Sequence, residues 1–122
     1  MAINITNPAN NSGAISPFPV SGTFTVGAGG GNIQVTVYQS DGTTLLPNTM
    51  VVPAGVMIAS GTGSGTWSVS VSRFGAYNGA IIKAVLTPNG GGTPDATSAT
   101  GINITSGGGT SESDSGGGGQ AL

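Results

Sequence analysis

The sequence predicts an all-β fold, either a sandwich or a barrel. Stretches rich in Thr, Val, Ser and Ile alternate between apolar and polar residues, which is the pattern of a strand with one buried face. Gly and Pro interrupt these stretches at short intervals, as turns do in such folds. No window places apolar residues at helical spacing. A chain of 122 residues fits one domain with a single core.

Three strands are expected in the first part of the chain. The segment Ile-Asn-Ile-Thr at residues 3–6 opens the domain, and the alternating segment 20–26 follows. Residues 33–39 form the clearest strand, because three apolar side chains recur at every second position. The expected inward-facing residues are Ile3, Ile5, Phe24, Val26, Ile33, Val35 and Val37.

The second part of the chain supplies the rest of a set of about seven strands. Residues 51–59 give one or two weaker strands, because a proline and a glycine interrupt them. Strands 66–72 and 80–87 follow, with Lys83 facing solvent, and a second Ile-Asn-Ile-Thr at 102–105 closes the domain. The expected inward-facing residues are Trp67, Val69, Val71, Ile82, Ala84, Leu86, Ile102 and Ile104.

The turns carry recognisable chemistry. Asp41-Gly42 is typical of a tight hairpin or turn in which the glycine takes a positive φ. Gly-rich runs at 27–31, 61–65 and 90–92 are expected to be loose connections. None is a phosphate-binding loop, because no Lys-Ser/Thr follows and no helix is expected nearby.

The composition changes after residue 105. Residues 106–122 are rich in Gly and Ser and contain no apolar residue before the last two positions. Such a segment does not bury enough surface to order itself, so a flexible tether is expected. The chain therefore divides into a β-sandwich domain at 1–105 and a tail at 106–122.

The few ionisable residues exclude several classes of function. Charged residues make up 5% of the chain, with two basic and four acidic side chains, and there is no Cys or His. Nucleic acid and membrane partners are not expected, because both need clustered Lys and Arg. Disulfides, thiol nucleophiles and the usual zinc ligands are absent. The N-terminus lacks a secretory signal, so synthesis in the cytoplasm is expected.

An enzyme is not expected. Asp41 and Asp95 are the only carboxylates at 1–105, and both lie in turn contexts where Asp bonds to its own backbone. A calcium ion held by one aspartate and backbone carbonyls is the alternative. Without His, the remaining nucleophile would be a Ser activated by Lys83, which faces water on its strand. We therefore expect no catalytic residue, cofactor or metal ligand.

A contact surface for a partner is the remaining kind of site. Trp67 alternates in phase with buried valines and is expected in the core, whereas other aromatic residues and the end of the tail are freer. The candidate partner contacts are Tyr38, Tyr77, Gln120, Ala121 and Leu122.

Several short motifs in order resemble a known family. They are Ile5–Pro8, Val20–Gly22, Val35–Tyr38 followed by Asp41-Gly42, Trp67-Ser68 and Lys83–Val85. Together they resemble bacterial immunoglobulin-like domains, which occur in surface proteins and in tailed-phage virion proteins. The resemblance covers most of residues 3–105, and it implies an immunoglobulin-like sandwich of antiparallel strands without catalytic residues. The last hairpin, at 86–92, departs from the family pattern.

The resemblance implies a structural protein of a phage particle. In that hypothesis the domain decorates a virion, docking on a protein lattice such as the major capsid or tail protein, with homo-oligomeric neighbours. The alternative is a carbohydrate- or cell-surface-binding module of a secreted or surface protein, in which Tyr38 or Tyr77 offers its ring to a glycan.

Overall fold

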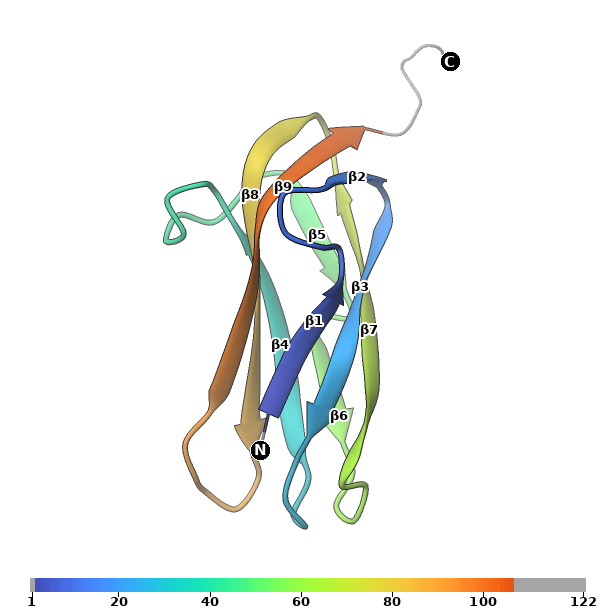
Figure 1. Cartoon of the computed structure of the whole chain (residues 1–122), viewed down its shortest axis with the longest axis vertical. Helices are drawn as coiled ribbons and strands as arrows, with labels where there is room; N and C mark the ends of the chain where they lie inside the picture. The colour runs from blue at the N-terminus through green and yellow to red at the C-terminus, as the bar shows by residue number, and fades with distance from the viewer. Residues whose placement is uncertain (1, 107–122) are drawn as a thin grey trace.

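The computed structural model describes residues 2–106 and shows a two-layered β-sandwich (Figure 1). The predicted all-β fold class is confirmed. Within the described residues, no helix has the length and apolar character needed to cross a membrane. The strands are β1 (Ala2–Asn7), β2 (Gly13–Ser16), β3 (Phe18–Thr25), β4 (Gly31–Tyr38), β5 (Thr49–Val52), β6 (Gly55–Ile58), β7 (Ser64–Arg73), β8 (Tyr77–Pro88) and β9 (Asp95–Ser106).

The strands form two sheets that face each other. One sheet has four strands in the order β1-β3-β7-β5, and the other has five in the order β2-β9-β8-β4-β6. All neighbouring strands are antiparallel except β2 and β9, which run parallel. The structure has nine strands where about seven are expected, because β2 is a strand that the sequence did not predict and segment 51–59 supplies both β5 and β6. In both places the chain divides into two strands that belong to opposite sheets.

The first division lies between β1 and β2. After β1 the chain leaves the four-stranded sheet, turns through Asn11 at a φ of 59°, and joins the edge of β9. The crossing is fixed to Thr100, whose N–H donates to Asn10 Oδ1 at 3.0 Å and whose carbonyl accepts from Asn11 N–H at 2.9 Å. One open side of the sandwich is thereby closed by the first segment of the chain.

The second division, between β5 and β6, closes the opposite side. Pro53 and Ala54 carry the chain from β7, the partner of β5, to β4, the partner of β6. The Val35 N–H donates to the Ala54 carbonyl at 3.2 Å and so begins the pairing of β6 with β4. The predicted interruption near Pro53 is thus a change of sheet.

The core lies between the sheets and matches the predicted alternation. Every residue expected to face inward is buried, except Ile5, which is partly buried against the core. Lys83 faces solvent, as predicted. Trp67 is a core residue, and its Nε1–H donates to the Asn4 carbonyl at 3.2 Å. The largest fully buried side chains are Val20, Ile33, Val71, Ile82, Leu86, Ile102 and Ile104.

The two aspartates play different structural roles. Gly42 has a φ of 76°, as expected for the Asp41-Gly42 turn, and Asp41 accepts hydrogen bonds from the N–H groups of Thr43 and Thr44. The prediction that Asp95 also forms a turn is wrong. Asp95 begins β9, and its Oδ2 accepts from the Ile3 N–H at 2.9 Å, so it connects the two sheets.

Candidate protein-docking edge

Exposed large apolar side chains gather around β5. Met50 and Val52 lie on β5 with 62% and 55% of their surfaces exposed, and Phe74, just after β7, is 86% exposed. Met57 on β6 is also exposed, at 76%, but it lies at the edge of the other sheet and is not part of this group. We call residues 49–52 together with Asn48 and Phe74 the β5 edge. Most apolar residues of this domain are inside, so this concentration on one edge marks a candidate contact surface.

The backbone of β5 is paired on one side only. The Phe74 N–H donates to the Asn48 carbonyl at 3.1 Å, and the register continues with Met50 opposite Ser72. Because hydrogen-bonded pairs alternate along an antiparallel ladder, Met50 and Val52 bond to β7. The N–H and C=O groups of Thr49 and Val51 therefore point away from the sheet, and within residues 2–106 they have no hydrogen-bond partner.

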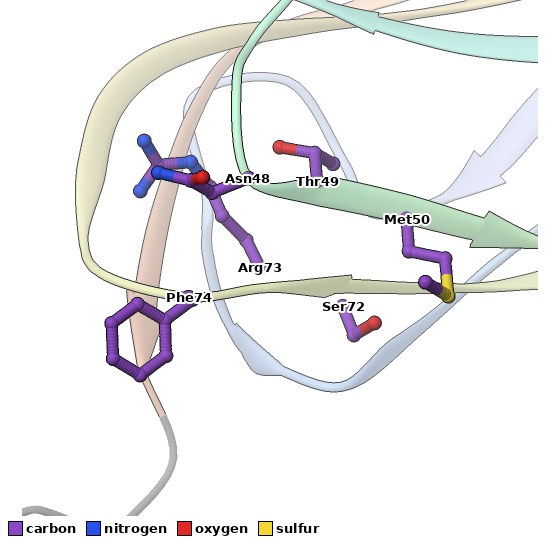
Figure 2. A pocket seen from close by; sticks show the side chains of 6 residues that line it. All are labelled: Asn48, Thr49, Met50, Ser72, Arg73 and Phe74. Carbon is purple, nitrogen blue, oxygen red and sulfur yellow. The ribbon is translucent and has the colours of Figure 1, made fainter.

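A shallow hollow lies beside this open edge. Figure 2 shows Met50, Ser72 and Phe74 on one side of the strands, and Thr49 and Arg73 on the other. The hollow has a volume of about 650 Å³ and is also lined by Asn48. Because Ser72 is small and lies opposite Met50, space remains between the larger side chains.

Arg73 is held firmly at the end of β7. Its N–H donates to Ser16 Oγ at 2.8 Å, and its Nη1 donates to the carbonyls of Gly75 at 2.7 Å and Ala76 at 3.2 Å. The guanidinium carbon lies 5.6 Å from the centre of the Tyr77 ring, a cation–π distance. Its Nε is buried and has no hydrogen-bond partner in the described structure.

The edge carries no charge that would oppose strand pairing. Residues 42–72 contain no Lys, Arg, Asp or Glu, so neither β5 nor β6 has a charged residue. Natural edge strands are commonly blocked by charges, by proline or by bulges. Here Pro53 ends β5 but leaves the outward groups of Thr49 and Val51 accessible.

The two tyrosines named as candidate contacts do not line the hollow of the β5 edge, although the Tyr77 ring lies beside Arg73. Tyr77 is half-buried against the core, and its hydroxyl accepts from the Ser40 N–H at 2.9 Å. Tyr38 is half-buried at the end of β4, opposite Leu45. The other candidates, Gln120, Ala121 and Leu122, lie outside the described residues.

Sequence reasoning did not single out the residues of the β5 edge. The available signal was the charge-free run 42–72, which contains Thr-Met-Val-Val at 49–52. Two adjacent valines and a methionine do not alternate cleanly, so the pattern shows a strand without showing which side chains are exposed. The neighbouring Phe74 resembles a core residue in sequence.

Within residues 2–106, no group of three or more His, Cys, Asp or Glu side chains is placed to hold a metal ion. The pKa of Asp41 is lowered from its ordinary value of 3.8, first by the Thr44 hydroxyl and then by the N–H groups of Thr44 and Thr43. These bonds favour its ionised form and belong to a turn.

Comparison with known proteins gives structural likeness only. No family model and no curated protein matches the sequence. The E. coli chaperone DraB has a similar structure, with a TM-score of 0.64 and 11% identity over 88% of this chain and 57% of that one. The periplasmic chaperone SfaE has a TM-score of 0.62 and 6% identity over 87% and 58%. The fold is an immunoglobulin-like sandwich.

Other neighbours come from complexes. A chain of the Salmonella enterica SafA pilin–SafB chaperone complex matches with a TM-score of 0.59 and 7% identity, over 86% of this chain and 54% of that one. A chain of the CsuC–CsuE chaperone–tip adhesion subunit complex of Acinetobacter baumannii matches with a TM-score of 0.55 and 9% identity, over 85% and 51%. This chain spans little more than half the length of these proteins.

These likenesses correct the predicted function. The neighbours are described as chaperones or come from complexes of a chaperone with a pilin or a tip adhesion subunit, which contradicts a phage virion or capsid decoration protein, its lattice partner and the glycan-binding alternative. The motifs that suggested a phage domain are strand alternation and a turn glycine, which many sandwiches require for geometric reasons. The neighbours are described as chaperones, in agreement with the expectation of a protein that is not an enzyme.

Proposed function

We propose that this domain is a non-enzymatic binding module that captures an extended segment of a partner protein at the β5 edge. The partner segment adds to the four-stranded sheet as a further strand beside β5. The observation that carries the proposal is the pair of unpartnered backbone positions, Thr49 and Val51, between exposed Met50, Val52 and Phe74. Backbone pairing supplies affinity, and the apolar side chains select the partner.

The other long edge of the sandwich is a poorer candidate. The edge of β9 is covered by β2 over residues 103–106, and its start is connected to β1 through Asp95. The exposed side chains of β9 between residues 96 and 105 are Ala, Ser, Thr and Asn. An incoming strand would find few free backbone groups there and little apolar surface.

The expected affinity of the β5 edge alone is weak. Completing the burial of Met50 and Val52 contributes about 2–4 kcal/mol at about 1.5–3 kcal/mol for each fully buried side chain. Up to about four backbone hydrogen bonds add about 0.5–1.5 kcal/mol each. Association costs about 4–15 kcal/mol in lost freedom of motion. A four-residue edge therefore suits a transient complex.

A transient complex is what a chaperone of assembly subunits requires. Two of the neighbouring structures contain a pilin or a tip adhesion subunit together with a chaperone. By this analogy, the partner is a subunit of a surface fibre, and the domain acts in the cell envelope. The analogy concerns fold and is carried to this chain as part of the proposal.

Selection from a display library of random 12-residue peptides tests the proposal. The full chain is the bait, and we expect enrichment of peptides with apolar residues at alternate positions. Met50→Lys should abolish the enrichment, because it places a charge in the apolar contact. Met57→Lys is the matched control, since it puts the same charge on the exposed edge of the opposite sheet. Absence of enrichment, or equal loss with both variants, would refute docking at β5.

A further inference from the structure

We infer that Arg73 is a specificity-determining residue of the β5 edge and binds an acidic side chain of the captured segment. The partner would then be an extended segment with alternating apolar residues and an Asp or Glu at the end that lies beside Thr49. This inference rests on the proposed function and adds to it the charge and the register of the partner.

The guanidinium of Arg73 is already in place for such a contact. Its Nη1 is engaged by the carbonyls of Gly75 and Ala76, and the plane lies against Tyr77. Tyr77 is itself fixed, because its hydroxyl accepts from the Ser40 N–H. A side chain that is held before binding loses little conformational entropy when a ligand arrives.

The unused edge of this guanidinium matches a carboxylate. Nε is the donor without a partner, and a guanidinium presents Nε–H and one Nη2 N–H in parallel on the edge away from Nη1. A carboxylate accepts two parallel hydrogen bonds from such an edge. It would satisfy the buried Nε, which has no hydrogen-bond partner in the described structure.

The described part of the chain offers no carboxylate to Arg73. Its two carboxylates are Asp41, which caps its own turn, and Asp95, which accepts from the Ile3 N–H. Residues 42–72 carry no charge, so Arg73 is the first charged side chain after Asp41 in the sequence, and it lines the hollow of the β5 edge.

Sheet geometry places the acid at one end of the partner. Arg73 lies opposite Thr49, and the side chains of both face the same side of the sheet. If a partner strand is added beside β5, the partner residue that pairs with Thr49 continues the line from Arg73 through Thr49. That residue lies about 5 Å from Thr49 and so about 10 Å from β7. A long arginine and an Asp or Glu span that distance across the small Thr49 side chain.

Figure 2 shows how Arg73 is oriented. Its side chain extends from β7 toward the start of β5, where Asn48 begins the strand, while the Phe74 ring points to the other side. Asn48 is exposed and lines the same hollow, so it is the side chain that would turn aside to admit a carboxylate. Binding of an acidic partner residue to Arg73 would fix the register of the partner strand, because that residue must lie beside Thr49. A shift of the register by one residue would turn the acidic side chain to the opposite face of the sheet.

The test uses peptides selected on the full chain. Enriched sequences should share an Asp or Glu at one position, and replacing it by Asn or Gln should weaken binding about tenfold or more. Arg73→Gln should remove that difference, so that the acidic and amide peptides bind alike. Arg73→Lys should keep part of it, because lysine keeps the charge without the parallel donors. The Arg73 Nε–H resonance should shift on addition of the acidic peptide and not of its amide form.

The outcomes separate the two proposals. If no peptide is enriched, the proposed function fails. If peptides are enriched without an acidic position, or if Arg73→Gln leaves the preference for acid unchanged, docking at β5 stands and the role of Arg73 is overturned. Should Arg73→Gln fail to fold, the comparison of acidic and amide peptides on the unaltered chain, together with Arg73→Lys, still decides the inference.

Discussion

Replacing Gly22 by alanine should destabilise the domain more than its small size suggests. Gly22 lies in β3 between Ile5 of β1 and Trp67 of β7. A Cβ at this position would lie 1.8 Å from the Asn4 carbonyl oxygen and 3.0 Å from Trp67 Nε1. The backbone of β1 would have to move by about 1.6 Å or more to reach an ordinary contact distance of at least 3.4 Å.

Two costs follow from that displacement. Overpacking against backbone costs about 1–3 kcal/mol. The moved Asn4 carbonyl also leaves the buried Trp67 Nε1–H without its acceptor, at a cost of about 1–3 kcal/mol. Together they predict a loss of about 2–6 kcal/mol, a large part of the roughly 5–15 kcal/mol that typically stabilises a domain.

Urea unfolding followed by tryptophan fluorescence measures this loss, because Trp67 is the only tryptophan of the chain. With a urea dependence of about 1–3 kcal/mol per molar, the midpoint should fall by about 1 M or more. Gly27→Ala is the control, since no atom lies within 4 Å of a Cβ there and its φ is not positive. A Gly22→Ala midpoint equal to that of Gly27→Ala would show that β1 does not approach β3 as closely as described.

Three further predictions concern other parts of the domain. Leu86→Ala should lower stability by about 2–5 kcal/mol in urea unfolding because Leu86 is fully buried, whereas Lys83→Ala on the opposite face should change it by less than about 0.5 kcal/mol. Asp95→Ala should speed hydrogen exchange of the Ile3 amide, which loses its acceptor, while Asp95→Asn retains an acceptor oxygen and should preserve protection. The pKa of Asp41 is lowered below 3.8, so the carboxylate stabilises its turn fully above pH 3.8, and this stabilisation is lost as the pH falls through the folded-state pKa. The amide resonances of Thr43 and Thr44 should therefore titrate with a midpoint below 3.8. A midpoint at or above 3.8 would contradict the hydrogen bonds to Asp41.

The candidate edge illustrates why exposure is hard to predict from sequence. Val51 and Val52 are identical neighbours, yet Val51 packs against the core and Val52 is exposed. Because side chains alternate along a strand, one of the two valines must face outward. The register of β5 against β7, in which Thr49 pairs with Arg73 and Val51 with the buried Val71, decides that Val52 is the exposed one. The sequence does not show that the Nε of Arg73 is buried without a hydrogen-bond partner. That environment is made by the carbonyls of Gly75 and Ala76 and the ring of Tyr77, which the turn between β7 and β8 brings together.

Asp95 and the N-terminal segment show the same limit. Pro-Asp-Ala is a reasonable turn signal from local chemistry, but the Ile3 N–H that Asp95 accepts lies 92 residues away in the chain. Likewise, nothing in the first residues indicates that β1 and β2 join different sheets. Pairing between segments that are distant in the sequence decides these features, and such pairing leaves no local pattern that can be recognised in a single sequence.

The sequence by itself determined the all-β class, the strands around Ile33, Trp67 and Ile82, and the face that each buries. It could do so because side-chain alternation is a local consequence of the extended backbone. The tertiary structure decided which strands pair, where the chain changes sheets, and which edge stays open. Those outcomes depend on contacts between distant segments. They add the β5 edge as a candidate site, while the contacts expected at Tyr38, Tyr77, Gln120, Ala121 and Leu122 stay predictions.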